Sequence, residues 1–287
     1  MKRIYTLFLA VLFAAIPVSG FTIESFNKDD AFLKIVPNAE LGFTKVLYHT
    51  LQLGADGYVF DYVNNGGQEI LFLFQRYSID ATMADRHTVT LLFQPLTLET
   101  QTRVPADVSA GIQIDDVVFP AGTALDLKYG FDFWRLSYLF SFIKTERFDV
   151  GAGLSLQLRN ASIVFENIDG SGRTVNQNLG PVPIIKLKAQ YRAPTGYFVG
   201  LEADGFYASS AIFNGADFPF AGWIYDAALR GGTEVNAATD AFLSVRVLGG
   251  GAVGTSSYET VFWTKGVEPY TSNNLTALIV SGGIRLK

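Results

Sequence analysis

The chain has 287 residues, of which 49% are hydrophobic and only 17% are charged, and its formal net charge is −5. Soluble domains carry about 25% charged residues, so this composition is too apolar for an ordinary soluble domain and excludes a disordered chain. The negative charge argues against a nucleic-acid partner, and the absence of cysteine excludes disulfides, thiolate metal sites and cysteine nucleophiles.

The N-terminus has the pattern of a secretory signal peptide. A basic head at residues 1–3 precedes an apolar run at 4–16, and small residues at 18–20 allow cleavage before Phe21. We expect residues 1–20 to be removed, with an uncleaved anchor helix as the alternative. No other run approaches the roughly 18 apolar residues that a spanning helix needs. Two classes remain, a soluble exported β-protein and an outer-membrane barrel.

Apolar and polar residues alternate through the mature chain, which is the period of β-strands. In residues 241–254, for example, Leu243 and Val245 lie on one face, and Ser244 and Arg246 lie on the other. The pattern predicts about ten strands, with eight or twelve as alternatives because 21–37 could add a pair. In chain order they are 39–48, 68–83, 86–102, 123–144, 147–165, 181–192, 196–209, 219–235, 241–256 and 275–286.

The expected connections alternate in length. Short turns lie near 84–85, 145–146, 193–195 and 236–239, and long loops cover about 49–67, 103–122, 166–180, 210–218 and 257–274. Short turns at one end and long loops at the other are typical of outer-membrane barrels, with both termini on the periplasmic side. We predict an all-β fold, a transmembrane antiparallel up-and-down barrel over residues 39–287. An N-terminal periplasmic or lumen segment, residues 21–38, would precede it.

The apolar strand faces end in aromatic residues, as a membrane-interface girdle would. These residues are Trp134, Tyr138, Tyr191, Tyr197, Tyr207, Trp223 and Tyr225. Because a period of two fits either orientation of the faces, a soluble exported sandwich remains the alternative. The girdle favours the membrane barrel.

The last strand, residues 278–287, closes on the alternating residues Ile284-Arg285-Leu286. It resembles the C-terminal assembly signal of Gram-negative outer-membrane β-barrel proteins, with two departures: Lys287 replaces a terminal aromatic, and Ser281 stands where the family often has glycine. Segments 84–93 and 131–138 are similar to an uncharacterised group of roughly ten-stranded barrels. The resemblance covers the whole chain and implies an architecture and a location in the outer membrane, but no activity.

The inward faces near the short turns carry charges of both signs. The predicted lumen charge network comprises Arg135, Arg159, Lys186, Lys188, Glu202, Asp204, Asp226, Arg230 and Arg246, with Glu40, Asp149, Glu234 and Arg285 in the same layer. A barrel of about ten strands is too narrow for a wide channel. We therefore expect a salt-bridge plug, with an ion or proton path as the alternative.

Nearer the long loops the same inward faces become apolar. The predicted ligand-binding set in this upper lumen is Phe72, Phe74, Leu96, Leu98, Leu127, Tyr129, Phe131, Phe133, Phe165 and Phe206. The outward residues there become polar, so the barrel is expected to rise above the membrane. The layer is either a pocket for a small apolar molecule or a self-packed core, closed by the first long loop or by residues 21–37.

Chemistry-bearing residues are few. The chain has two histidines, His49 and His87, and neither lies in a serine-nucleophile context. His49, with Asp56 or Asp61 of the first loop, is the one arrangement that resembles a catalytic group. We expect no catalytic residues, no metal site and no cofactor.

The expected function is a non-enzymatic, porin-like outer-membrane barrel that holds or passes small, mostly apolar molecules through its upper lumen. One alternative is a structural or surface-interaction barrel that acts through long loops such as 257–274. Another is a lipid-modifying enzyme that uses His49. The expected partners are outer-membrane lipid, the barrel assembly machinery through the C-terminal strand, and a small apolar ligand, with no nucleic acid.

Overall fold

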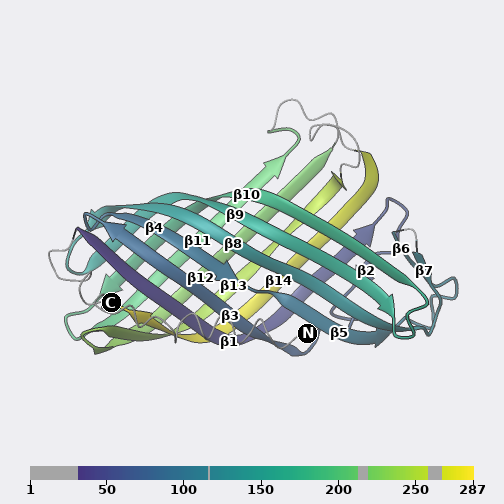
Figure 1. The fold of residues 1–287 in the computed structure, drawn as a ribbon, viewed down its shortest axis with the longest axis horizontal. Helices are drawn as coiled ribbons and strands as arrows, with labels where there is room; N and C mark the ends of the chain where they lie inside the picture. Colours follow the sequence, from purple (N-terminus) through teal and green to yellow (C-terminus); the bar gives the residue numbers. More distant parts are fainter. Residues whose placement is uncertain (1–31, 116, 213–218, 258–266) are drawn as a thin grey trace, which may run out of the picture.

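The computed structural model describes residues 32–115, 117–212, 219–257 and 267–287 (Figure 1). The predicted signal peptide, residues 1–20, lies outside the described residues. Within the described part of the chain, no helix is long and apolar enough to cross a membrane.

The described residues form fourteen strands. They are β1 (Leu33–Leu53), β2 (Phe60–Asp61), β3 (Leu71–Met83), β4 (His87–Gln94), β5 (Thr97–Arg103), β6 (Ile112–Ile114), β7 (Val117–Phe119), β8 (Ala124–Lys144), β9 (Phe148–Asn167), β10 (Arg173–Arg192), β11 (Tyr197–Ser209), β12 (Phe220–Asn236), β13 (Thr239–Ser257) and β14 (Val267–Leu286).

Ten of these strands close into an antiparallel barrel. The order runs from β1 through β3, β4 and β8 to β14, and β14 then pairs with β1 from Asn38↔Arg285 to Leu53↔Thr271. The strand β5 continues the line of β4 along β8, and β6 and β7 form a separate hairpin. The predicted all-β, ten-stranded antiparallel barrel is therefore confirmed.

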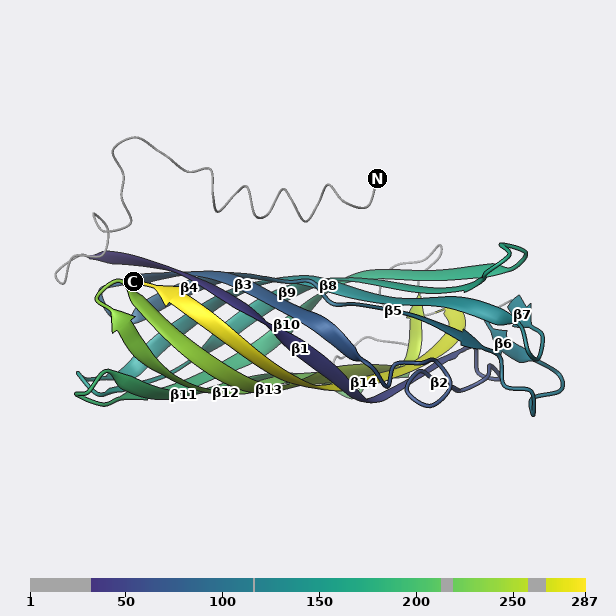
Figure 2. The same ribbon diagram turned by 90° about the horizontal axis from the view of Figure 1, so that it is seen from below.

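The first residues of β1 and the last residues of β14 lie at the end of the barrel that carries the short turns. Figure 2 shows the start of β1 and the end of β14 at one end of the barrel, and the β6–β7 hairpin at the other. The turn between β3 and β4 is tight: three residues separate the paired Met83 and His87, and two of them, Ala84 (48°) and Asp85 (59°), have positive φ. The chain ends and the short turns therefore share one end of the barrel, as the sequence-based expectation has it.

Several predicted boundaries are wrong. The strand β14 begins at Val267, inside the expected long loop 257–274, β1 ends at Leu53, inside the expected loop 49–67, and the expected strand 86–102 is divided into β4 and β5. The expected long loop 166–180 is a short turn, because β9 and β10 pair from Tyr191↔Phe148 up to Arg173↔Glu166. Its polar sequence reflects a hairpin that continues above the membrane, where neither face needs to be apolar. In addition, β1 pairs with β3 from Leu33 onward, so residues 33–38 belong to the wall and not to a preceding segment.

The outer wall carries an apolar band of membrane height. On β9 the outward residues from Phe148 to Leu158 are apolar, Leu154 is 67% exposed, and the exposed residue above them is the polar Asn160. Ten residue steps span about 33 Å along a strand, and a tilt of roughly 40° projects this to about 25 Å, the height of the lipid-facing band of such barrels. Large apolar side chains at this exposure are stable in lipid and not in water.

Aromatic side chains of the outer wall lie against glycines of the neighbouring strand. A Cβ atom on Gly249 would collide with the Tyr225 ring, and one on Gly251 would collide with the Trp223 ring. The Tyr225 hydroxyl also lies 2.5 Å from the Thr276 hydroxyl. Glycines on β13 thus make room for the girdle residues that the sequence predicted on β12.

We expect Leu154→Arg to destabilise the barrel by about 2–4 kcal/mol, because the new charge would face hydrocarbon. Asn160→Arg, on the same face of β9 above the band, is the matched control and should cost less than about 1 kcal/mol. Urea titration of the protein refolded into lipid vesicles measures both. Equal and small effects would place the wall in water and contradict the membrane assignment.

Candidate functional site: two lumen layers and a break in the wall

A layer of ion pairs crosses the lumen at mid-height, and Asp226 lies at its centre. The Asp226 carboxylate accepts hydrogen bonds from Arg76 at 3.3 Å, from Arg135 at 3.1 Å, and from Arg246. Arg135 comes from β8 and Asp226 from β12, four strands apart in a ten-stranded barrel. The contact therefore bridges opposite walls.

The remaining charges extend the layer around the barrel. Arg135 and Lys186 both form ion pairs with Asp204, and the distance from Lys186 to Asp204 is 3.3 Å. Lys186 also lies 3.8 Å from Glu202. Arg230 links Glu202, at 2.7 Å, to Glu40 on β1. Such a mixed-sign set satisfies its own buried charges, which is what a plug requires.

Seven of the nine predicted network residues belong to this layer: Arg135, Lys186, Glu202, Asp204, Asp226, Arg230 and Arg246. Lys188 instead pairs with Asp149 at 2.8 Å, nearer the short turns. Arg159 lies higher, 6.0 Å from the centre of the Phe131 ring, and has no ion pair with any described residue. The sequence analysis missed Arg76, although it follows Phe72 and Phe74 on the same inward face of β3.

The upper lumen is a packed core closed by the first long loop. Phe60 and Tyr62 of that loop are fully buried, with ring centres 5.1 Å from Phe165 and 6.0 Å from Tyr129, respectively. The predicted residues Phe72, Phe74, Leu96, Leu98, Leu127, Tyr129 and Phe165 belong to this core, with Phe131 packed against it and Phe133 buried below. Phe206 is half-buried and lies elsewhere, in the wall. The structure therefore shows the self-packed arrangement in this layer.

His49 is part of the same core. Its ring is fully buried, stacks on Tyr62 at 4.2 Å, and places Nδ1 2.7 Å from the Gln68 side-chain oxygen. Asp61 accepts hydrogen bonds from the backbone N–H groups of Val63 and Asn64, so it organises its own turn. The contacts of His49 hold the first loop inside the barrel. No cluster of acidic residues and histidines suited to a metal ion occurs among the described residues.

The barrel wall is broken between β10 and β11. Their ladder runs from Arg192↔Phe198 only to Ile185↔Gly205. Beyond that point β10 continues to Arg173 paired with β9 alone, and β11 continues to Ser209 paired with β12 alone. Figure 1 shows the loop ends of β10 and β11 diverging.

Two prolines account for this break. Pro181 and Pro183 are both odd-numbered residues of β10, so their backbone nitrogens point to the same side of the strand. The N–H of Arg192, an even-numbered residue, points to the β9 side and donates to the carbonyl of Arg147. The nitrogens of odd residues therefore face β11. Proline has no N–H to donate, so a longer ladder with β11 would lack two donors in succession.

An apolar groove of about 440 Å³ lies at the break. Its lining includes Pro183, Ile184 and Phe206 beside the gap, and outward residues such as Leu154 and Ile185 on the wall. The level of Leu154 places it within the apolar band. The groove thus extends from side chains that point toward the lumen at the gap to the lipid-facing surface.

No family model matches the chain, and no curated protein does either. Among solved structures, the chain is similar to the outer membrane protease OmpT from Escherichia coli, with 9% identity, 88% of this chain and 96% of that chain covered, and a TM-score of 0.49. It is also similar to a Pseudomonas aeruginosa FadL homologue, with 8% identity, coverage of 88% and 90%, and a TM-score of 0.38. For the Pseudomonas putida toluene transporter TodX the identity is 8%, the coverage 87% and 89%, and the TM-score 0.33.

We expect Asp226→Asn to destabilise the barrel by about 3–5 kcal/mol, because three buried arginines would lose their shared carboxylate. Glu99→Gln is the control: Glu99 forms an exposed pair with Lys128 at 3.4 Å, and its loss should cost at most about 1 kcal/mol. Denaturant unfolding in lipid vesicles distinguishes them. Similar small losses for both variants would show that the layer is not a tightly paired plug.

Proposed function

We propose that this protein is a non-enzymatic barrel of the outer membrane that binds small, mostly apolar molecules and passes them laterally, through the break between β10 and β11. The observation that carries the proposal is the apolar groove of about 440 Å³ at that break. Sites for small molecules typically have volumes of about 300–1,000 Å³ and mostly apolar linings.

Passage along the barrel axis meets two obstacles. Phe60 and Tyr62 close the lumen from the loop side, and the charge layer around Asp226 crosses it at mid-height. Opening the charge layer would expose several buried charges at once, at a cost of several kcal/mol for each unpaired ion. The lateral route requires no such step, because the wall lacks backbone hydrogen bonds there already.

The groove selects for apolar molecules. Its side-chain hydroxyls include Ser137 and Ser155, and these two bond each other at 2.8 Å. Burying a polar group without a hydrogen-bond partner is unfavourable, so a polar ligand gains little from this lining. Hydrocarbon surface gains about 25 cal/mol per Å² on leaving water.

A disulfide bond across the gap between β10 and β11 tests the proposal. Ile184→Cys/Phe206→Cys would lie one step beyond the last paired residues, and the chain has no other cysteine to compete. We expect the reduced protein, in lipid nanodiscs, to bind the apolar fluorophore N-phenylnaphthylamine saturably. Oxidation should abolish that binding, because the disulfide closes the groove, and a thiol reductant should restore it.

Gln190→Cys/Gly200→Cys is the matched control, since this pair joins the same two strands where they are already paired. Its oxidation should leave fluorophore binding unchanged, and empty nanodiscs give the background. Equal binding by the oxidised and reduced forms of the first variant would rule out the break as the site.

A further inference from the structure

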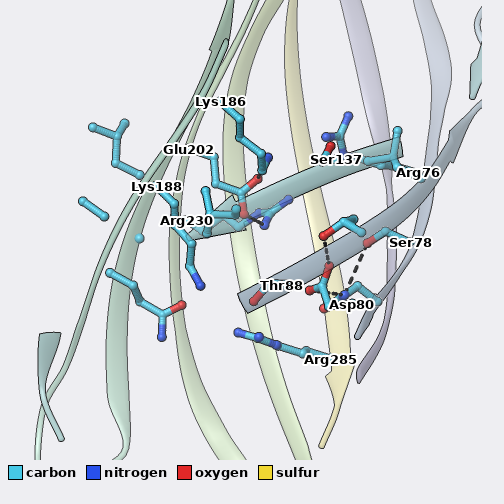
Figure 3. A pocket seen from close by; sticks show the side chains of 18 of the residues that line it. Arg76, Ser78, Asp80, Thr88, Ser137, Lys186, Lys188, Glu202, Arg230 and Arg285 are labelled. Atoms are coloured by element: carbon cyan, nitrogen blue, oxygen red, sulfur yellow. Dashed lines mark hydrogen bonds and ion pairs between the residues drawn. The ribbon is translucent and has the colours of Figure 1, made fainter. Parts of the chain in front are cut away.

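A second cavity lies below the charge layer, toward the short-turn end of the lumen (Figure 3). Its volume is about 70 Å³. A water molecule needs roughly 10–15 Å³ on the same measure, so the cavity has room for about five water-sized atoms or for a small tetrahedral ion. It adjoins the groove at the wall break, since Ser137 lies on the lining of both.

The lining of this cavity carries more cationic than anionic side chains. Six cationic side chains contribute to it, Arg76, Arg135, Lys186, Lys188, Arg230 and Arg285, against two carboxylates, Asp80 and Glu202. The first three and Arg230 are neutralised within the charge layer, and Lys188 pairs with Asp149. The remaining cation is Arg285.

Arg285 forms no ion pair with any described residue, and its Nε is buried without a hydrogen-bond partner. Both nearby carboxylates accept hydrogen bonds, but among the described residues only Glu202 has a cationic partner, and the donors to Asp80 are neutral. Asp80 accepts hydrogen bonds from Asn38 at 3.0 Å and Thr90 at 2.6 Å, and Glu202 accepts one from Arg230 at 2.7 Å. An arginine in a partly buried site with free donors is a site for an oxyanion.

We propose that this cavity binds a small free oxyanion of the phosphate class, held by Arg285 and by Lys188. Figure 3 shows both side chains extending into the cavity. Ser78 and Thr88 lie on the lining as hydroxyl donors for the remaining oxygens. The occupant is a soluble ion and not a lipid headgroup, because the closed wall separates this part of the lumen from the bilayer.

Isothermal titration of the refolded barrel with inorganic phosphate tests the proposal, with sodium chloride at equal ionic strength as the reference. We expect saturable binding to one site. Arg285→Gln should weaken it about tenfold, because a charge-assisted hydrogen bond is lost. Arg285→Lys, which keeps the charge but loses the planar fork, should weaken it less.

Arg147→Gln is the matched control, since Arg147 is exposed in the turn at the same end of the barrel; its affinity should equal that of the unchanged protein. Absence of saturable phosphate binding by the unchanged protein overturns the proposal, and so does equal binding by Arg285→Gln. If Arg285→Gln does not fold, Arg285→Lys decides: an affinity below that of Arg147→Gln supports the site, and an equal affinity overturns it.

Discussion

The whole structure depends on one constraint: in hydrocarbon, every backbone N–H and C=O must be paired within the protein. The barrel meets it by closing β14 onto β1 over the full height of the wall. Pairing is incomplete at two places: β3 has no ladder with β5 beyond Tyr77↔Phe93, and between β10 and β11 Pro181 and Pro183 replace two N–H groups that would face β11. Because proline carries no donor, the wall opens there without leaving those two nitrogens as unpaired donors in lipid.

The interior follows from the small bore of a ten-stranded barrel, which side chains can fill. Charged residues meet at mid-height and neutralise one another around Asp226. Above them the aromatic core takes in Phe60 and Tyr62 of the first loop. Below them lies a cavity lined by Arg285, which has no ion pair with the residues that the structure describes. The lumen is therefore divided along its axis, and the groove at the wall break adjoins the lower cavity at Ser137.

The alternation of apolar and polar residues was sufficient to predict the strand number, the antiparallel order and most of the charge layer, because period-two patterning directly reflects which side of the wall a residue faces. It could not predict β10 above Pro181, since residues 173–178 are mostly polar and show no apolar alternation. Nor could it place Phe60 and Tyr62 in the core, because a loop that folds inward has no periodicity. The sequence does contain an indication of the wall break, because two prolines two residues apart in one strand remove two N–H donors from the same side of that strand.

The central claim is that the wall is open to lipid beside Phe206, and spin-label accessibility tests it most directly. A nitroxide at Phe206→Cys, in a bilayer, should collide frequently with lipid-soluble oxygen. A nitroxide at Ala228→Cys is the comparison, because Ala228 is an inward residue of the intact wall and only 1% exposed. An open wall predicts much higher oxygen accessibility at position 206 than at 228. Equal, low accessibility at both positions would show that β10 and β11 enclose the lumen, and would contradict a lateral route.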